Sequence, residues 1–498
     1  MLFSTICMFL DGLGHTLVIN RVEPISLRRR IVTKIVKPFG WRDKIGYLMG
    51  DFGNDFTFLL SSTFLLKFYT DVMGVKAFVV GIVMMVARFV DAFTDIAMGR
   101  ICDRSHTLKN GKFKPWIRRM CAPVAISSFL IYQSGFSDAS MTFKIVWLFI
   151  TYILWSSIFY TSINIPYGSM ASAISPEPAD RQSLSTFRSI GSTLAGLIVG
   201  AGVPLFAYST YPDGQVYLDG EKFTFIAGVF SVLSVIAYLV CYYLTTERVK
   251  LSNTPAQHKR NSLKNMLLAA VKNRAILSIT SASVLMLLAQ FTVQSMSGYI
   301  FPNYYNSTTA QSASTLVMMG AMFLSAFASK PLAKRFGKAE LSAASAAFAA
   351  LISAVTFFVR PQNVWVYVAL QSISWIGLGL FTMVSWAIIT DVIDYSEIKN
   401  GIREDGAIYA IYSFSRKLGQ AAAAGLSGGL LSLIGYAENT QNSPSVLNGI
   451  FNISTIVPAI GFLILAIILW FWYPLHKKQV EENSAYLKEK HSANNSNQ

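Results

Sequence analysis

Charged residues are scarce in this sequence of 498 residues: they account for 14% of the chain, whereas hydrophobic residues account for 53%. A typical soluble domain is about 25% charged. The composition therefore excludes an ordinary soluble protein and indicates a chain that lies largely within a lipid bilayer.

Cysteine and histidine are also rare. The four cysteines are scattered and form no CxxC pair, so the sequence gives no support for a zinc site or a disulfide framework. All five histidines fall outside the long apolar runs, which removes the usual general base from the membrane interior. Because no serine or cysteine nucleophile stands in a recognisable setting either, we expect neither an enzyme nor a resident cofactor.

Long apolar runs are abundant. Each has about the 20 residues that a helix needs to cross a hydrocarbon core of ~30 Å. Their number predicts an all-α membrane protein with twelve transmembrane helices. The runs lie near residues 46–70, 77–101, 117–135, 145–172, 185–208, 223–244, 275–301, 312–329, 340–359, 364–390, 407–435 and 449–473.

The net charge of +16 is distributed unevenly among the loops. Every second loop is poor in basic residues, and these loops contribute only Lys76, Lys144, Lys222 and Arg360. By the positive-inside rule, the basic segments lie in the cytoplasm together with both termini, so the charge indicates topology and not a nucleic-acid partner. The basic segments are residues 28–44, 104–119, 248–274, 330–338 and 477–490.

A polar stretch divides six apolar runs from the other six and predicts two six-helix bundles joined by a cytoplasmic linker. Each half carries a basic turn after its second run, as repeated halves of a transporter do. The N-terminal residues are expected to be a flexible cytoplasmic extension or to follow a start codon assigned too early; a cleaved signal peptide is the alternative. The predicted organisation is an extension at 1–40, bundles at 41–246 and 275–474, the linker at 247–274 and a cytoplasmic tail at 475–498.

Three ionisable residues interrupt the second apolar run, in the stretch ARFVDAFTD. Arg88, Asp91 and Asp95 are spaced i, i+3 and i+7, which places them on one stripe of a helix. A charge in hydrocarbon costs at least ~2.5–3.5 kcal/mol on insertion scales, so the stripe must face the protein interior. The two carboxylates repel each other unless a sodium ion, a lithium ion or a proton joins them, and Thr94 and Thr161 offer neutral oxygen ligands. The alternative is a permanent salt bridge to Arg88.

Polar residues in other runs are candidates for binding a sugar. Asp55 is suited to accept hydrogen bonds from sugar hydroxyls, or alternatively to pair with Arg188 or Lys417. Asp51, one turn earlier, is expected near the cytoplasmic interface, where water would solvate it. Arg416 points about 100° away from Lys417, so we expect Lys417 inside and Arg416 at the cytoplasmic rim.

The fourth run contains Thr161 and Asn164, three residues apart and followed by Pro166. Tyr160 and Tyr167 offer rings on which the face of a sugar can stack. The alternative for both rings is a place in the protein core or against lipid, because aromatic residues make up 13% of the chain.

In four blocks, the chain resembles the glycoside-pentoside-hexuronide cation symporters of the major facilitator superfamily, which include melibiose permease. The resemblance runs from about Trp41 to Tyr473. The blocks are KIGYLMGDFGNDF with KFYTDVMG, FVDAFTDIAMGRICDRS with NGKFKPW, NIPYGSMASAISPEPADRQSLSTFRSIGS, and DVIDYSEIKNGIREDGAIYAIYSFSRKLGQ.

The resemblance implies the major facilitator fold, with two six-helix bundles around a central cavity that opens alternately to each side. Asp91 and Asp95 match the cation-site carboxylates, which are metal ligands if the cation is sodium, and Thr161 matches a neutral ligand. The implied sugar-cavity residues are Asp55, Arg188 and Lys417, with Lys417 close to the cation carboxylates. The chemistry above adds Tyr160 and Asn164 to this set. The residues that resemble the charged network closing the cytoplasmic side are Arg181, Asp391, Asp394 and Glu397.

Two positions depart from melibiose permease: Asn164 replaces an aspartate that contacts sugar, and Gly168 replaces a tryptophan. These departures argue against specificity for galactosides, and a site with one negative charge fewer tolerates an anionic sugar such as a hexuronide better. We therefore predict a sugar symporter coupled to Na⁺ or H⁺, working as a monomer in a bacterial cytoplasmic membrane. A sugar exchanger or exporter of the same fold and, from a different class, a lysolipid flippase are the alternatives.

Overall fold

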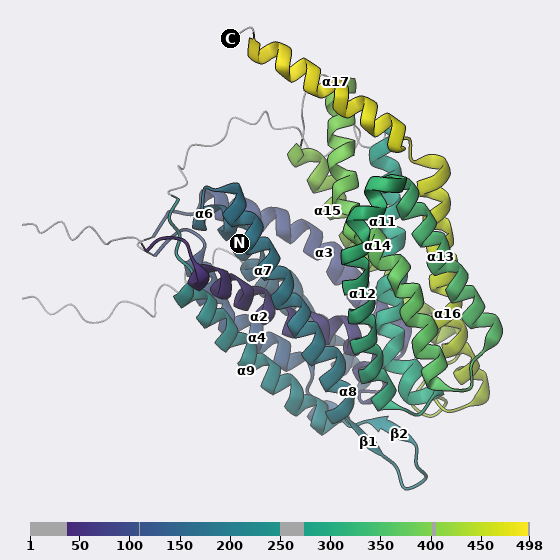
Figure 1. The fold of residues 1–498 in the computed structure, drawn as a ribbon. Coiled ribbons are helices and arrows are strands. Elements are labelled where there is room, and N and C mark those ends of the chain that lie inside the picture. Colours follow the sequence, from purple (N-terminus) through teal and green to yellow (C-terminus); the bar gives the residue numbers. More distant parts are fainter. Residues whose placement is uncertain (1–36, 109, 250–272, 401–404, 497–498) are drawn as a thin grey trace, which may run out of the picture.

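The computed structural model describes residues 37–108, 110–249, 273–400 and 405–496. Across these ranges the chain folds into two helical bundles that lie side by side (Figure 1). Most of the predicted N-terminal extension and of the predicted linker falls outside the described residues.

The N-terminal bundle contains six helical segments whose ends agree with the predicted runs to within several residues. Two of the six are α-helices interrupted by short π-helical stretches. In chain order the segments are α2 (Trp41–Asp71), α3 (Ala77–Arg104), α4 (Lys114–Ile131), α5–η3–α6 (Met141–Ile153, Leu154–Tyr160, Thr161–Ile174), α7–η4–α8 (Pro178–Leu197, Ile198–Gly202, Val203–Phe206) and α9 (Gly220–Leu244).

The C-terminal bundle repeats this arrangement with six further segments and adds a polar helix, α17 (Lys477–Ser496), that packs on α13 and α14. Two helices, α12 and α14, extend beyond the predicted runs. The segments are α11–η5 (Arg274–Tyr299, Ile300–Tyr304), α12 (Thr308–Phe336), α13 (Lys338–Val359), α14 (Val364–Asn400), α15 (Asp405–Leu433) and α16–η6 (Pro444–Ile467, Ile468–Trp472).

Nine of these segments are long and apolar enough to cross a membrane by length and composition, among the described residues. The other three members of the bundles, α2, α4 and α15, carry more polar or charged residues. Large apolar side chains on the outer surface, such as Phe327 and Phe358 at 80% exposure each, form the surface that lipid covers. The predicted all-α fold of twelve membrane helices in two bundles is confirmed.

Short polar residues begin several helices by satisfying their first backbone N–H groups. The carboxylate of Asp219 accepts hydrogen bonds from the N–H groups of Glu221 and Lys222 at the start of α9. Asn273 caps α11 in the same way. These caps stand at the polar boundaries of the segments and help to fix where each helix starts.

An antiparallel hairpin, β1 (Tyr208–Thr210) and β2 (Val216–Leu218), joins α8 to α9 at one end of the molecule (Figure 1). We call this the hairpin end. Asn306 of the C-terminal bundle donates to the carbonyl of Gly214 in the hairpin turn and accepts from the N–H of Val216. The bundles are therefore in contact at the hairpin end.

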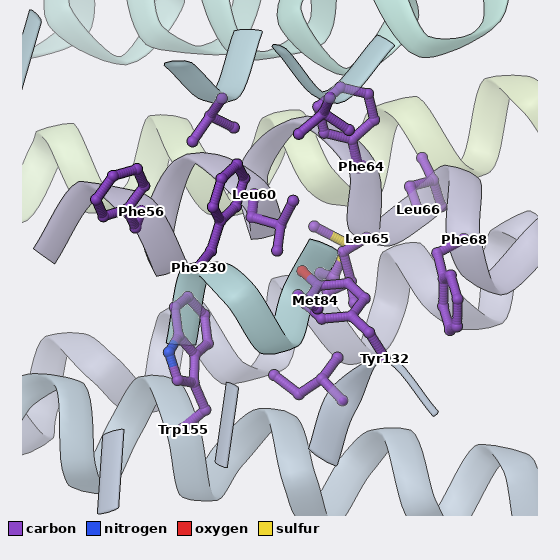
Figure 2. Close-up of a cluster of buried hydrophobic side chains, with 14 of the residues drawn as sticks. Phe56, Leu60, Phe64, Leu65, Leu66, Phe68, Met84, Tyr132, Trp155 and Phe230 are labelled. Atoms are coloured by element: carbon purple, nitrogen blue, oxygen red, sulfur yellow. The ribbon is translucent and has the colours of Figure 1, made fainter. Parts of the chain in front are cut away.

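The hydrophobic core also connects the two bundles. Figure 2 shows part of one core, where Phe56, Leu60 and Phe64 of α2 pack among side chains that include Phe230 of α9 and Trp155 of η3. This core continues across the bundle boundary to buried residues of the C-terminal bundle. Those residues are Met296, Tyr299, Ile300, Phe301, Ala310, Tyr367, Val368, Leu431, Tyr436, Val446, Ile450, Phe451 and Ile453. A second core fills the rest of the C-terminal bundle.

Candidate functional site

The charged stripe of α3 faces the protein interior, as its spacing predicts. Asp91 is 4% exposed and Arg88 is 9% exposed, and the Arg88 guanidinium lies 3.4 Å from the Asp91 carboxylate. Arg88 also lies over the ring of Phe58 at 5.0 Å, a favourable cation–π distance. The structure therefore contains the salt bridge between Arg88 and Asp91 that the sequence offered as an alternative to a bound cation.

Asp91 also receives two hydroxyl groups that the sequence analysis missed. Ser156 and Ser157 donate to its Oδ1 at 3.0 and 2.5 Å. Both serines belong to η3, a π-helical stretch, and such stretches occur frequently at functional sites. Neighbouring residues of an α-helix point about 100° apart, so sequence spacing gave no reason to expect both at one carboxylate.

Asp95 joins the two bundles. Its Oδ1 accepts a hydrogen bond of 2.9 Å from Thr161, at the start of α6, and its Oδ2 pairs with the ammonium of Lys417 on α15. Lys417 also donates to the backbone carbonyl of Asp91 at 3.2 Å. The predicted cation residues Asp91, Asp95 and Thr161 thus lie together, and Lys417 points inward toward them. Arg416 instead lies over the ring of Trp386 at 5.7 Å.

We call Arg88, Asp91, Asp95, Ser156, Ser157, Thr161 and Lys417 the acidic cluster. Its two carboxylates are balanced by two basic groups, so the cluster is neutral with no added ion. Thr94 does not extend it, because its hydroxyl donates to the backbone carbonyl of Asp91 and not to a carboxylate.

A second polar group surrounds the middle of α2. Asp51 is 6% exposed and accepts from Nε of Arg188 at 2.9 Å, so the expectation that water solvates Asp51 is wrong. Asp55 accepts a short hydrogen bond from Ser192 of α7, and the contacts described for it do not include the alternative ion pair with Arg188 or Lys417. The Arg188 side chain remains 39% exposed, which leaves part of its guanidinium accessible.

Asn164 lies on the same side of the N-terminal bundle. Its side-chain oxygen accepts a hydrogen bond of 3.4 Å from Asn54, whose own oxygen accepts one of 2.6 Å from Tyr238. The predicted residues Asp55, Asn164 and Arg188 are therefore held by α2, α6 and α7, with positions fixed by further hydrogen bonds.

The two tyrosines of the fourth segment have different surroundings. Tyr160 is partly buried and stacks on Phe58 with ring centroids 5.9 Å apart, close to both polar groups. Tyr167 is fully buried, stacks on Tyr47 at 4.6 Å, and lies beneath the guanidinium of Arg188. The ring of Tyr167 therefore supports Arg188 from within the core.

The residues predicted for the cytoplasmic network lie on α7 and α14. Asp391 pairs with Lys338 of α13 at 2.5 Å, within its own bundle, and Asp394 and Glu397 follow on α14. Arg181 is exposed near the start of α7, and the described contacts include no ion pair between it and Asp391.

A third group of ion-paired residues, which the sequence analysis did not identify, lies at the hairpin end. The ammonium of Lys67 is 2.5 Å from Asp71, 2.6 Å from Oδ1 of Asn303 and 2.9 Å from Oη of Tyr436. The hydroxyl of Tyr436 in turn donates to Asp71 at 2.8 Å. A lysine inside the first apolar run was the signal available in the sequence, since ionisable residues in spans are usually functional.

A cavity of about 250 Å³ lies between the bundles, bounded by α2, α7 with η4, α11, α12 and α14. Its lining includes Leu59 and Gly196, each one helical turn beyond Asp55 and Ser192 respectively. The cavity therefore continues from the Asp55 region toward the hairpin end.

Comparison with known proteins identifies the family. Residues 46–477 match the family described as MFS/sugar transport protein. The chain is 30% identical over 469 residues to the uncharacterized symporter YjmB of Bacillus subtilis, covering 93% of this chain and 97% of that protein. It is 30% identical over 447 residues to a glucuronide carrier protein homolog of Escherichia coli, with 89% and 94% covered. It is 29% identical over 479 residues to an isoprimeverose transporter of Lactiplantibacillus pentosus, with 96% and 97% covered.

Solved structures agree at the level of the fold. The D-xylose-proton symporter superposes with a TM-score of 0.59 at 15% identity, over 87% of this chain and 97% of that one. The nucleoside transporter NupG superposes with a TM-score of 0.60 at 13% identity, over 87% and 99%. The chain therefore belongs to the MFS/sugar transport protein family, within the major facilitator superfamily, and is a multi-pass membrane protein that transports sugar.

Proposed function

We propose that this chain is a cation-coupled sugar symporter of a bacterial cytoplasmic membrane. The observation that supports this most directly is the position of Asp95, which one bundle supplies and which pairs with Lys417 of the other bundle. A charge that reaches Asp95 must change this contact between the bundles, and transport requires the bundles to move relative to each other.

The acidic cluster provides the ligands that a small alkali cation prefers. Two carboxylates and the hydroxyls of Ser156, Ser157 and Thr161 supply hard oxygen atoms, and hard cations bind oxygen. No group of three or more acidic, histidine or cysteine residues suited to a metal ion occurs among the described residues. Two carboxylates fit a monovalent ion, Na⁺, or a proton better than a divalent metal.

Lys417 competes with the coupling cation for Asp95. The cluster is neutral with Arg88 and Lys417 in place, so an added cation would give it a net positive charge in a poorly hydrated region. When the Lys417 ammonium moves away from Asp95, the cluster loses one positive charge and the excess positive charge disappears. Cation binding then frees an ammonium group beside the sugar site, where it can donate hydrogen bonds to the substrate or pair with an anionic group of the substrate.

The substrate we propose is a glycoside, a pentoside or a hexuronide. Asp55 offers a carboxylate to sugar hydroxyls, and the exposed part of Arg188 offers donors to hydroxyls or to a carboxylate. Asn164, a neutral residue, leaves the site less repulsive to an anionic sugar than an aspartate would. The names of the relatives, a glucuronide carrier homolog and an isoprimeverose transporter, fall in the same classes.

The distribution of basic residues gives the proposed orientation. The hairpin end carries Lys76, Lys144, Lys222 and Arg360, whereas the described parts of the basic segments lie at the opposite end. The hairpin end then faces the outside and both termini face the cytoplasm. Contacts between the bundles at the hairpin end support a carrier that is closed to the outside.

A lysolipid flippase is less well supported. A flippase needs a lateral apolar opening beside the charged site. An apolar groove of about 890 Å³ does lie on the outer surface between α4 and α9. Its lining contains neither the acidic cluster nor Asp55 or Arg188, so lipid in this groove would not reach the charged residues.

Transport by the purified protein in proteoliposomes tests the proposal. Wild type should accumulate a radiolabelled sugar such as methyl glucuronide or isoprimeverose against its gradient when a Na⁺ or a proton gradient is imposed. Asp95→Cys should abolish this accumulation while the protein remains folded and inserted. Asp213→Asn, which removes an exposed carboxylate from the hairpin turn, is the matched control and should transport like wild type.

The two gradients, imposed separately, identify the coupling ion. Uphill uptake that persists unchanged in Asp95→Cys would remove Asp95 from the mechanism. Sugar movement that neither gradient drives, but that a second sugar on the opposite side accelerates, would replace symport with exchange.

A further inference from the structure

The cavity between the bundles has the position expected of a second sugar subsite. Leu59 on α2 and Gly196 on α7 each lie four residues beyond the residues that hold the Asp55–Ser192 hydrogen bond. Four residues of helix correspond to about 6 Å. A ligand anchored at Asp55 and longer than one ring therefore enters the cavity next.

Two glutamines in the cavity wall have side-chain oxygens that lack a partner. Oε1 of Gln311 on α12 and Oε1 of Gln371 on α14 are buried and accept no hydrogen bond. Gln311 as a residue is 2% exposed. A buried acceptor without a partner destabilises a protein, so two in one wall indicate that something with donor groups occupies this space.

A third glutamine is already oriented by its neighbours. Gln294 of α11 donates its amide to the hydroxyls of Thr63 and Ser62 at 2.9 and 3.3 Å, so the two hydroxyls hold its amide end. Thr193 of α7 adds a hydroxyl to the lining, and Trp375 of α14 adds an indole.

The lining contains no charged residue. Amide and hydroxyl groups together with an aromatic ring are the side chains that bind a neutral ligand rich in hydroxyls. The volume of about 250 Å³ is a little below the ~300–1,000 Å³ typical of sites for whole drug-sized ligands. The cavity therefore suits one further ring and not a complete second substrate.

We propose that this cavity is a subsite for the second, uncharged glycosyl ring of a disaccharide or similar glycoside, with Gln311 and Gln371 accepting hydrogen bonds from its hydroxyls. This inference rests on the proposed sugar transport and extends it. The anchor near Asp55 and Arg188 holds the first ring, and the glutamine subsite selects glycosides over free monosaccharides.

Binding of matched sugars to the purified full-length protein tests the subsite. The first pair is D-xylose and isoprimeverose, a xylosyl-glucose, which differ only by the added glucose ring. The second pair is glucuronic acid and a disaccharide that carries a terminal glucuronyl residue. Gln311→Leu and Gln371→Leu remove the acceptors with little change in volume. Each should weaken disaccharide binding by about three- to tenfold, the effect of one lost hydrogen bond, and leave monosaccharide binding within about twofold.

A third variant fills the cavity without removing a polar group. A Cβ at Gly196 would meet only Leu59, at an ordinary contact distance of 3.6 Å, so Gly196→Leu is compatible with the fold and directs its side chain into the space. It should abolish the preference for the disaccharide. Met383→Leu, a change of similar volume at an exposed position of α14 outside the cavity lining, is the control and should bind both sugars like wild type.

The outcomes separate the subsite from the general proposal. Selective loss of disaccharide binding in the two glutamine variants and in Gly196→Leu supports the subsite. Equal changes for both sugars, no change, or a wild type that binds monosaccharides but no disaccharide overturns it and leaves sugar transport intact. A wild type that binds none of the four sugars, with or without Na⁺, overturns the proposed hexuronide or pentoside transport itself.

Discussion

Removing the ammonium of Lys67 should open the hairpin end. Lys67 and Asp71 have side chains that are only 2% and 6% exposed, and both belong to α2. Their partners Asn303 and Tyr436 come from the other bundle. The complete network therefore exists only while the two bundles are in contact at this end.

The size of the effect follows from the burial of Asp71. In Lys67→Met the carboxylate stays buried and keeps the hydroxyls of Tyr436 and Thr70 but loses its counter-ion. Breaking one partner of a buried ion pair typically costs about 3–5 kcal/mol. When the bundles separate, water hydrates Asp71 and the penalty disappears. A penalty of about 3 kcal/mol changes the equilibrium between the two states about 100-fold in favour of separation.

Electron spin resonance distances between labels at Asp213→Cys and Glu438→Cys would measure this shift. Both positions are exposed and belong to different bundles: Asp213 lies in the hairpin turn, and Glu438 lies in the loop between α15 and α16, whose Asn442 contacts Gln215 of the hairpin. In the described part of the chain the native cysteines Cys102, Cys121 and Cys241 are buried, which limits unwanted labelling. Lys67→Met should add a longer distance to the distribution.

Two further variants complete the test. Lys76→Met removes the same charge from an exposed position at the same end and should leave the distances unchanged. Asp71→Asn combined with Lys67→Met removes both charges and should restore part of the short distance, because no uncompensated charge stays buried. Distances in Lys67→Met that match wild type, or a double variant as open as the single one, would refute the reasoning.

Two predictions concern stability. Gly428→Val should lower the unfolding temperature, because a Cβ there would overlap the carbonyl oxygen of Ala77. Overpacking of this kind typically destabilises a protein by about 1–3 kcal/mol. Gly429→Val, which has open space around its Cβ, is the control and should unfold like wild type. Asp219→Ala should cost about 1 kcal/mol by removing the cap of α9. Burial alone would raise the pKa of Asp219, but the hydrogen bond from the backbone N–H of Lys222 and the other hydrogen bonds to the carboxylate lower it overall. Its contribution is therefore complete above the ordinary aspartate pKa of about 4 and is lost as the pH falls through the lower folded value, so thermal unfolding of wild type and variant should converge only in strong acid.

The sequence was sufficient to predict the architecture, because hydrophobic runs of membrane length are a direct consequence of the bilayer. It also predicted the inward stripe of α3, since helical spacing fixes which residues share a face. The contact between Asp95 and Lys417, which are far apart in the chain, rested on family resemblance, because no local pattern relates two helices that cross in space.

What escaped prediction depends on the crossing of helices or on local departures from the α-helix. Ser156 and Ser157 reach one carboxylate from a π-helical stretch, whose geometry periodicity does not reveal. Asp51 pairs with Arg188 and is not solvated by water, because α2 and α7 pack closely at Gly191, where a side chain would overlap the backbone of Leu48. The cavity glutamines come from separate helices and become neighbours only in the folded protein.

Helices α3 and α15 carry Asp95 and Lys417, the ion pair that joins the two bundles. Helices α3 and α15 run antiparallel and touch near Gly81 and Gly428, where a Cβ at Gly81 would lie 2.9 Å from backbone atoms of α15. Asp95 lies fourteen residues, or about 21 Å, along α3 from this contact, and Lys417 lies correspondingly along α15. A close backbone contact at one point and an ion pair at another hold the two helices in one relative orientation. In the symport mechanism that we propose, a cation that replaced this ion pair would leave the glycine contact as a pivot, and binding of one ion would then change the angle between whole bundles.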